Sequence, residues 1–141
     1  MAKYHAFGAK LQIKDTTFKD VAGVRDISGP GMSADTVDVT THDSTDAWEE
    51  YLKGTKNPGE LSFDLVFDPT ETAMQAELLT AMQSDPDDDP EDFRVIFNTT
   101  TAKIWEFKGY VTGFEPSLPV KGEISASVTI KITGKPNFAA T

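Results

Sequence analysis

Three adjacent residues, His42, Asp43 and Ser44, have the side chains of a hydrolase triad. In such a triad the histidine lies between nucleophile and orienting acid, and known triads draw these residues from distant parts of the chain. Neighbouring side chains of an extended segment point to opposite faces, so His42 and Asp43 would diverge. The only other histidine, His5, is near the start of the chain. We therefore predict a polar loop whose Thr, Asp and Ser side chains hydrogen-bond their own backbone, and a chain that is not an enzyme.

Two further segments have side chains that could bind a ligand. The run DPDDDPED, residues 85–92, has carboxylates that a hard cation such as calcium prefers. It lacks the ligand at every second residue and the central glycine of a calcium loop, so we expect a solvated acidic loop and no bound metal or cofactor. Trp48 and Tyr51 lie in a very polar neighbourhood, where an aromatic pair covers an edge of the core or packs against a partner. Both interpretations stay open.

The composition limits the class of protein. A chain of 141 residues is most simply one domain, large enough to bury a hydrophobic core without disulfides or a structural metal. It has no cysteine, which excludes disulfides, thiolate nucleophiles and cysteine-based zinc sites. The start of the chain has no apolar signal region, and no apolar run approaches the length of a membrane span. We therefore expect a single domain, residues 1–141, without a membrane span.

The net charge of −10 is concentrated in two segments. Residues 35–50 contain six acids and residues 85–92 contain six more, with no Lys or Arg in either segment. Outside them, 11 acids stand against 13 basic residues, so the rest of the chain is nearly neutral. The sequence therefore predicts no basic patch that could grip nucleic acid.

Three segments, 59–69, 103–116 and 120–133, alternate between apolar and polar residues with a period of two. This pattern is typical of strands with one buried face. The segment 120–133 is far longer than an average strand of about five or six residues. Shorter strands are predicted at 8–14, 23–28, 36–41 and 93–98. The expected buried faces comprise Leu61, Phe63, Leu65, Phe67, Trp105, Phe107, Val111, Val120, Ile124, Ala126, Val128, Ile130 and Ile132.

One helix is predicted at residues 71–83. Met74, Leu78 and Met82 follow each other at intervals of four and form an apolar stripe, which indicates core packing more than a ligand site. Pro86 ends the helix, because proline disfavours helical geometry in the residue before it. Strands, one helix and further strands together predict a mainly β fold, a β-sandwich or barrel with one packed α-helix.

The order of these pieces carries a family resemblance. GVRDISGPGMSADTVDVTTHDSTDAWEEYLKG (23–54), NPGELSFDLVFDP (57–69), a helix, an acidic turn and GYVTGFEPSLPVKGEISASVTIKITGKP (109–136) follow one another. Over about residues 8–136 the chain resembles the major tail tube proteins of long, non-contractile-tailed (siphovirus-type) bacteriophages. SGPGMSADTVDVTTHDS (28–44) and GEISASVTIKITGKP (122–136) are the most specific segments, and neither is a catalytic motif.

This resemblance implies a structural virion protein. Subunits of the family form hexameric rings that stack into a tube, and their strands join an intersubunit β-barrel around the channel through which the viral DNA leaves the capsid. The implied partners are further copies of the chain, the tail tip or initiator, the tape measure and the tail terminator proteins. DNA would pass without sequence-specific binding. The implied location is the virion tail, assembled in the host cytoplasm.

The resemblance also assigns roles to residues. Residues 40–58 would form a long assembly loop without strand alternation, and residues 1–7 and 136–141 would be flexible or interface arms. Lysines in the channel would hold phosphates in a salt-dependent way, so Lys108, Lys121 or Lys131 should pair with acids or lie outside it. The expected interface residues are Thr41, His42, Asp43, Asp46, Trp48, Glu49, Tyr51, Leu52 and Lys53, and the expected channel-lining residues are Ser62, Asp64, Glu106, Thr112, Ser125, Ser127 and Thr129.

Two alternatives remain at this stage. A tube subunit of a contractile or type VI secretion-like system would share the fold and differ in what passes through the channel. A ligand- or calcium-binding β-sandwich would instead use Trp48, Tyr51 and residues 85–92 as its site.

Overall fold

A computed structural model describes residues 8–14, 17–21, 23–67, 75–97 and 103–140. Seven strands form one antiparallel sheet in the order β2–β1–β7–β8–β9–β6–β3, and β4 and β5 form a separate two-stranded ribbon. The fold is therefore mainly β with one short helix, as predicted. The elements are β1 Lys10–Lys14, β2 Phe18–Asp20, β3 Val24–Ser28, β4 Ser33–Asp38, η1 Thr45–Ala47, β5 Tyr51–Asn57, β6 Glu60–Val66, α1 Gln75–Met82, β7 Glu91–Ile96, β8 Ile104–Ser117 and β9 Ser125–Ala140.

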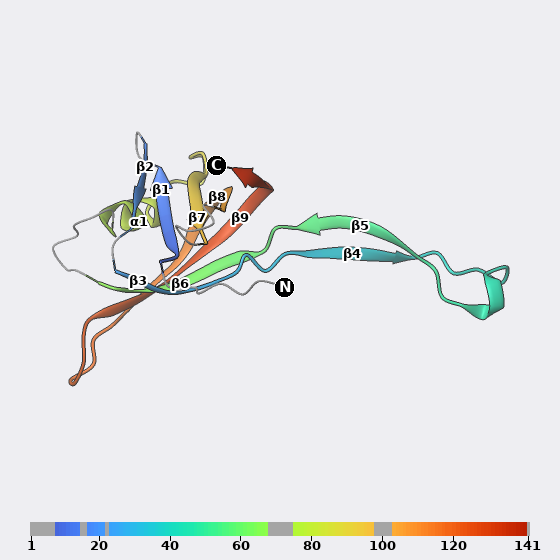
Figure 1. Ribbon diagram of the computed structural model, residues 1–141, viewed down its shortest axis with the longest axis horizontal. Helices are drawn as coiled ribbons and strands as arrows, with labels where there is room; N and C mark the ends of the chain where they lie inside the picture. Colours follow the sequence, from blue (N-terminus) through green and yellow to red (C-terminus); the bar gives the residue numbers. More distant parts are fainter. Residues whose placement is uncertain (1–7, 15–16, 22, 68–74, 98–102, 141) are drawn as a thin grey trace.

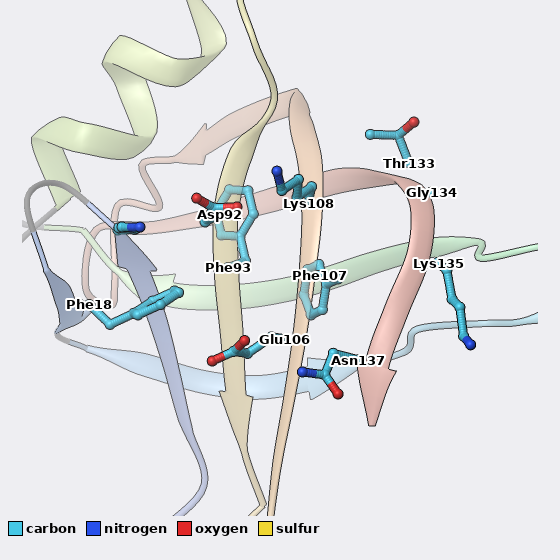
Figure 2. A pocket seen from close by; sticks show the side chains of 11 residues that line it. Phe18, Asp92, Phe93, Glu106, Phe107, Lys108, Thr133, Gly134, Lys135 and Asn137 are labelled. Carbon is cyan, nitrogen blue, oxygen red and sulfur yellow. The ribbon is translucent and has the colours of Figure 1, made fainter. Parts of the chain in front are cut away.

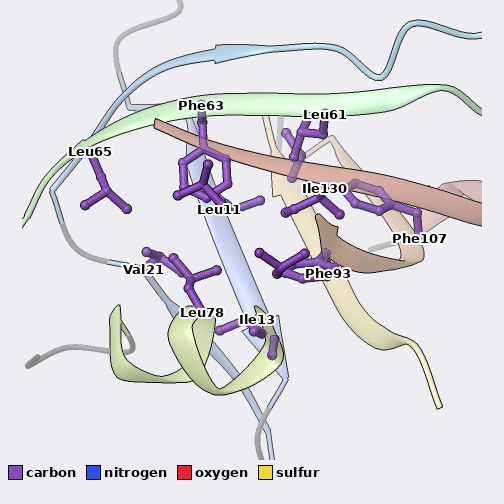
Figure 3. Packing of buried hydrophobic residues seen from close by; sticks show 14 of the residues in the cluster. Leu11, Ile13, Val21, Leu61, Phe63, Leu65, Leu78, Phe93, Phe107 and Ile130 are labelled. Carbon is purple, nitrogen blue, oxygen red and sulfur yellow. The ribbon is translucent and has the colours of Figure 1, made fainter. Parts of the chain in front are cut away.

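The long hairpin of β8 and β9 joins two halves of the large sheet. Strand β7 pairs with residues 104–109 of β8, and β1 and β2 continue the sheet from β7. Strand β6 pairs with residues 125–131 of β9, and β3 continues the sheet from β6. Because the halves attach at different ends of the hairpin, the curved sheet closes over itself, and β1 crosses β6 (Figures 1 and 3). The result is the sandwich-like arrangement that the sequence predicts.

The hairpin is irregular where the two halves meet. The β8–β9 register shifts between Val111 and Gly113, and a bulge of this kind bends a strand and increases its twist. At Gly109 an added Cβ would lie 2.7 Å from the carbonyl oxygen of Lys131 and 2.8 Å from Cγ2 of Ile130. Only glycine permits this close approach of the two strands.

The core lies between the two halves of the sheet and α1 (Figure 3). Strand β6 alternates as predicted, with Leu61, Phe63 and Leu65 buried between exposed polar residues. Val128 and Ile130 of β9 are fully buried, which confirms the predicted register of this strand. Burial of such apolar side chains contributes about 1.5–3 kcal/mol each relative to leaving them exposed.

Two predictions about the ends of β9 are wrong. Val120 is fully exposed, because β9 begins only at Ser125. Residues 136–140 continue β9 and are not a separate arm. Trp105 shares the face of Phe107, as predicted, because β7 pairs with β8 without a register shift and places Val95 opposite Trp105, but its side chain is only half-buried. Residues 1–7 and 141 lie outside the described residues.

The helix packs as predicted at one position and differently at another. Leu78 is fully buried and Ala81 is buried beside it, because residues three apart also share a helix face. Met82 is 42% exposed, so its predicted core packing is wrong. The helix ends there: the Ser84 hydroxyl donates to the carbonyl oxygen of Ala81 at 2.8 Å. Met74 lies outside the described residues.

Candidate assembly surfaces

Strands β4 and β5 form a ribbon that projects far from the packed body (Figure 1). We call residues 33–57 the arm. No residue of the arm is buried, and only Ser44 and Gly54 are half-buried. The expectation of a loop over 40–58 is wrong for residues 51–57, which form β5 and pair with β4, for example Val37 with Leu52. The alternation that reveals a strand comes from burial of one face, and neither face of the arm is buried.

The turn at the end of the arm, residues 38–50, is closed by its own hydrogen bonds, and we call it the tip. The Ser44 hydroxyl accepts from the Thr41 N–H at 3.0 Å and donates to Oε2 of Glu50 at 2.9 Å. Its partner is therefore a carboxylate and not His42, which leaves the triad without its central bond. The Thr40 hydroxyl accepts from the Glu50 N–H at 2.7 Å. Hydrogen bonds from Thr40 lower the pKa of Asp38.

The arm exposes large apolar side chains. Trp48 is 74% exposed, Leu52 60%, Tyr51 53% and Val37 52%. The Tyr51 hydroxyl donates to Oε2 of Glu49 at 2.5 Å, and this bond raises the pKa of the phenol. None of these side chains belongs to the hydrophobic core of the described residues. Trp48 and Tyr51 therefore do not cover an edge of the core in this chain.

The arm brings all nine expected interface residues onto one projection. Thr41, His42, Asp43, Asp46, Trp48 and Glu49 lie at the tip, and Tyr51, Leu52 and Lys53 lie in β5.

A polar face covers the outside of β6, β9 and the end of β8. Ser62 lies opposite Thr129, and Asp64 opposite Ser127, on neighbouring strands. Because Val128 and Ile130 of β9 point into the core, these residues point away from it. Six of the seven expected channel-lining residues share this outer face: Ser62, Asp64, Thr112, Ser125, Ser127 and Thr129. Sequence reasoning missed Glu115, which lies opposite Ser127 beyond the bulge in β8.

Glu106 is placed apart from the other six. It lies on the half of the sheet that contains β7, and it forms an ion pair with Arg94 there. The Arg94 guanidinium also lies 3.9 Å from the centre of the Phe18 ring. Figure 2 shows Glu106 with Lys108 and Asn137 around a hollow of about 440 Å³. Glu106 and Thr112 belong to the same strand and follow the same alternation. The pattern therefore cannot show that they lie on different halves of the sheet.

The acidic run 85–92 has the features of a turn. Asp88 accepts from the Asp85 N–H through its carboxylate at 2.8 Å, and its own N–H donates to the Asp85 carbonyl at 3.0 Å. Burial, and then the carboxylates of Glu77, Asp92 and Asp88, raise the pKa of Glu91. Within the described residues, no group of three or more His, Cys, Asp or Glu side chains is placed to hold a metal ion. In that same part of the chain no helix is long and apolar enough to cross a membrane.

Solved structures with the same fold come from tail-like assemblies. A chain from the tail of an empty gene transfer agent particle, solved with C6 symmetry, is 23% identical, with a TM-score of 0.74 over 98% of this chain and 100% of that one. A chain from the sheath/tube terminator of an extracellular contractile injection system is 11% identical, with a TM-score of 0.76 over 99% of each chain. A chain from the sheath–tube complex of such a system is 12% identical, with a TM-score of 0.74 over 99% of this chain and 93% of that one. At these identities the likeness shows the fold.

A family model adds what the structures alone do not show. No curated protein matches the chain at a significant level. Residues 3–139, nearly the whole chain, match the model for the lambda phage tail tube protein. The chain belongs to this family, and it is a structural tail tube protein of the virion tail.

Proposed function

We propose that the chain forms homohexameric rings, that the arm joins successive rings into a tube, and that the tube is the conduit through which viral DNA leaves the capsid. The observation that carries this proposal is a four-stranded panel with two free edges, from which a closed barrel can be built.

The panel consists of residues 111–117 of β8 together with β9, β6 and β3. Among the described residues, β3 pairs only with β6. Among them too, residues 111–117 of β8 pair only with β9, because the pairing between β7 and β8 ends at Gly109 of β8. Open edges of this kind are a hazard in an isolated protein and a template for pairing with another chain. Pairing the β3 edge of one copy with the β8 edge of the next closes a ring if the rotation closes. Six copies would contribute about 24 strands, and barrels of that size enclose a channel.

The outer face of the panel suits a DNA channel. Its hydroxyls and carboxylates, including Ser62, Asp64, Ser127 and Thr129, offer no cation to phosphate. Lys131 of β9 lies 3.8 Å from the carboxylate of Glu60, so its charge has a partner. Each lysine or arginine free to bind phosphate would add a salt-dependent hold on the DNA. A face with few free cations lets DNA pass without sequence-specific binding.

The ends of such a tube require other proteins. If the arm joins one ring to the next, the first and the last ring each leave one contact surface uncovered. Tail tip or initiator and tail terminator proteins would cover these surfaces, and a tape measure protein would set how many rings are added. The relatives with the same fold include a tube terminator of a contractile injection system. The family match favours the non-contractile tail over a contractile tube.

Electron microscopy of the purified, concentrated chain tests assembly. We expect tubes or six-fold rings with a central channel, whereas single subunits at all concentrations would contradict the proposal.

Labelling tests which face lines the channel. The chain has no cysteine, so Ser127→Cys introduces a single thiol on the panel face, and Asp87→Cys introduces one in the turn after α1. In assembled tubes a small maleimide should label both, while a maleimide attached to a bulky protein should label only Asp87→Cys. Equal labelling by the bulky reagent would place Ser127 outside the channel.

A further inference from the structure

A groove of about 730 Å³ lies where the base of the arm meets the end of β9. Met32, Pro136 and Phe138 form its apolar part, and Lys53, Lys56 and Lys135 its charged part. We propose that this groove binds the arm tip of a second copy of the chain, with Trp48 against the apolar part and the tip carboxylates against the three lysines. This inference rests on the proposed function, because it identifies the surface that receives the arm.

Two of the three apolar residues of the groove are exposed, whereas Pro136 is buried. Met32 is 46% exposed and Phe138 37% exposed. The Phe138 ring packs edge-on against Trp105 with 4.8 Å between ring centres, and Trp105 packs in the same way on Phe97. Cavities of about 300–1,000 Å³ lined largely by apolar side chains are typical binding sites. The groove therefore offers a preformed place for one large aromatic side chain.

The charges of the groove complement those of the tip. Lys53, Lys56 and Lys135 line the groove together with no acidic residue. Among the described residues, no ion pair involves any of these three lysines. The tip carries Asp38, Asp43, Asp46, Glu49 and Glu50 with no Lys or Arg. Complementary charges of this kind steer encounter and fix the register of an interface.

Trp48 gives the tip its anchor. It is the most exposed side chain of the arm's large hydrophobic residues, at 74%. Tryptophan buried near the centre of an interface often carries much of its binding free energy. The other acidic segment, 85–92, has no aromatic residue, so it matches only the charged part of the groove.

The occupant must come from another chain. Lys56 lies at the base of the ribbon, opposite Ala34, and Lys53 lies further along β5, opposite Thr36. The ladder between β4 and β5 carries the tip of the same chain away from the groove (Figure 1). Tip and groove are different surfaces, so the contact is head-to-tail and propagates from copy to copy.

Charge reversal tests the inference. The tip variant carries Asp43→Lys, Asp46→Lys and Glu49→Lys, and the groove variant carries Lys53→Glu, Lys56→Glu and Lys135→Glu. In either variant, tip and groove have the same sign, so copies of one variant should repel each other. We expect both to lose tubes at concentrations where the parent polymerises, as measured by sedimentation velocity and electron microscopy. The matched control, Lys→Arg at the same three groove positions, keeps the charge and should polymerise.

An equimolar mixture of the two variants gives the decisive result. The positive tip of one variant then meets the negative groove of the other, and the negative tip meets the positive groove, so tubes should return with the variants alternating. A misfolded variant could not be rescued in this way. Continued polymerisation of the groove variant alone, or no tubes in the mixture, would overturn the inference while the proposed function stands. A parent chain that never assembles would instead remove the proposed function.

Discussion

The packed body and the arm both contain β-strands, but these strands differ in how much apolar surface they bury. In the body each long strand buries one face, and side chains such as Phe63, Val128 and Ile130 have 2% or less of their surface exposed. In the arm neither face is buried, and Trp48 and Leu52 are 74% and 60% exposed. Burial of apolar surface is the main driving force for folding. The body therefore determines whether the chain folds, and the arm has apolar surface left for other copies.

Local hydrogen bonds shape the arm, but they contribute little to the stability of the body. An isolated two-stranded hairpin is at best marginally stable in water. The connections at its base are close: an added Cβ at Gly59 would lie 2.2 Å from the carbonyl oxygen of Gly31. The arm thus leaves and re-enters the body at adjoining points, and changes beyond them should not disturb the core.

The largest effect on stability is expected from Phe63→Ala. Phe63 is 2% exposed at the centre of the core, so the lost burial and the cavity should lower the free energy of unfolding by about 3–5 kcal/mol. Urea unfolding of unassembled subunits at low concentration measures this. The arm control, Trp48→Ala, removes an even larger aromatic group but should change stability by no more than about 0.5 kcal/mol while it abolishes tubes. Similar losses for both variants would erase the distinction between body and arm.

The helix offers a second contrast within the body. Leu78→Ala should cost about 2–5 kcal/mol because Leu78 is fully buried. Met82→Ala, one turn further along, should cost less than about 1 kcal/mol because that side chain is 42% exposed. Thermal and urea unfolding of the two variants measure the difference. If the costs are equal, the helix packs on a different face.

A third contrast uses two glycines. Gly109→Ala places a Cβ 2.7 Å from the Lys131 carbonyl oxygen, and this overpacking should cost about 1–3 kcal/mol. At Gly31, beside the base of the arm, an added Cβ meets no atom within 4 Å, so Gly31→Ala should be nearly neutral. Equilibrium unfolding compares them, and a neutral Gly109→Ala would argue against the close approach of β8 and β9.

The smallest effect concerns the acids of the body. The pKa of Glu91 is raised by burial and by three neighbouring carboxylates, so the folded state binds this proton more tightly than the unfolded chain. Glu91 therefore lowers stability as pH rises through and above its ordinary pKa of 4.5. Glu91→Gln should be more stable than the parent at pH 7, by less than about 1 kcal/mol because solvent screens the charges. The gain should vanish at about pH 3, where both states are protonated, and a gain that persists there would rule out charge as its cause.

The body and the arm also differ in how far the sequence predicts them. The alternation in β6 and β9 predicted their buried faces correctly, because burial of one face creates that pattern. Strand β5 exposes both faces and therefore has no such pattern, so the sequence did not predict it. For the same reason the predicted bounds of β4, 36–41, differ from the observed Ser33–Asp38. Strand β2 has three residues and is too short to show a period.

The candidate sites follow the same division. The sequence alone draws attention to the tip, because Trp48 stands in a polar neighbourhood of one continuous segment. The groove was not, because Met32, Lys53 and Phe138 come from three distant segments that only the folded chain brings together.

Removing the arm tests the central claim most directly. Because Gly31 and Gly59 adjoin, residues 33–57 can be replaced with a short Gly-Ser linker without stretching the body. One urea titration of the armless chain, read by circular dichroism and paired with electron microscopy, should show unfolding within about 1 kcal/mol of the parent subunit and no tubes at any concentration. An armless chain that unfolds, or one that still forms tubes, would contradict the account in which the body folds and the arm assembles.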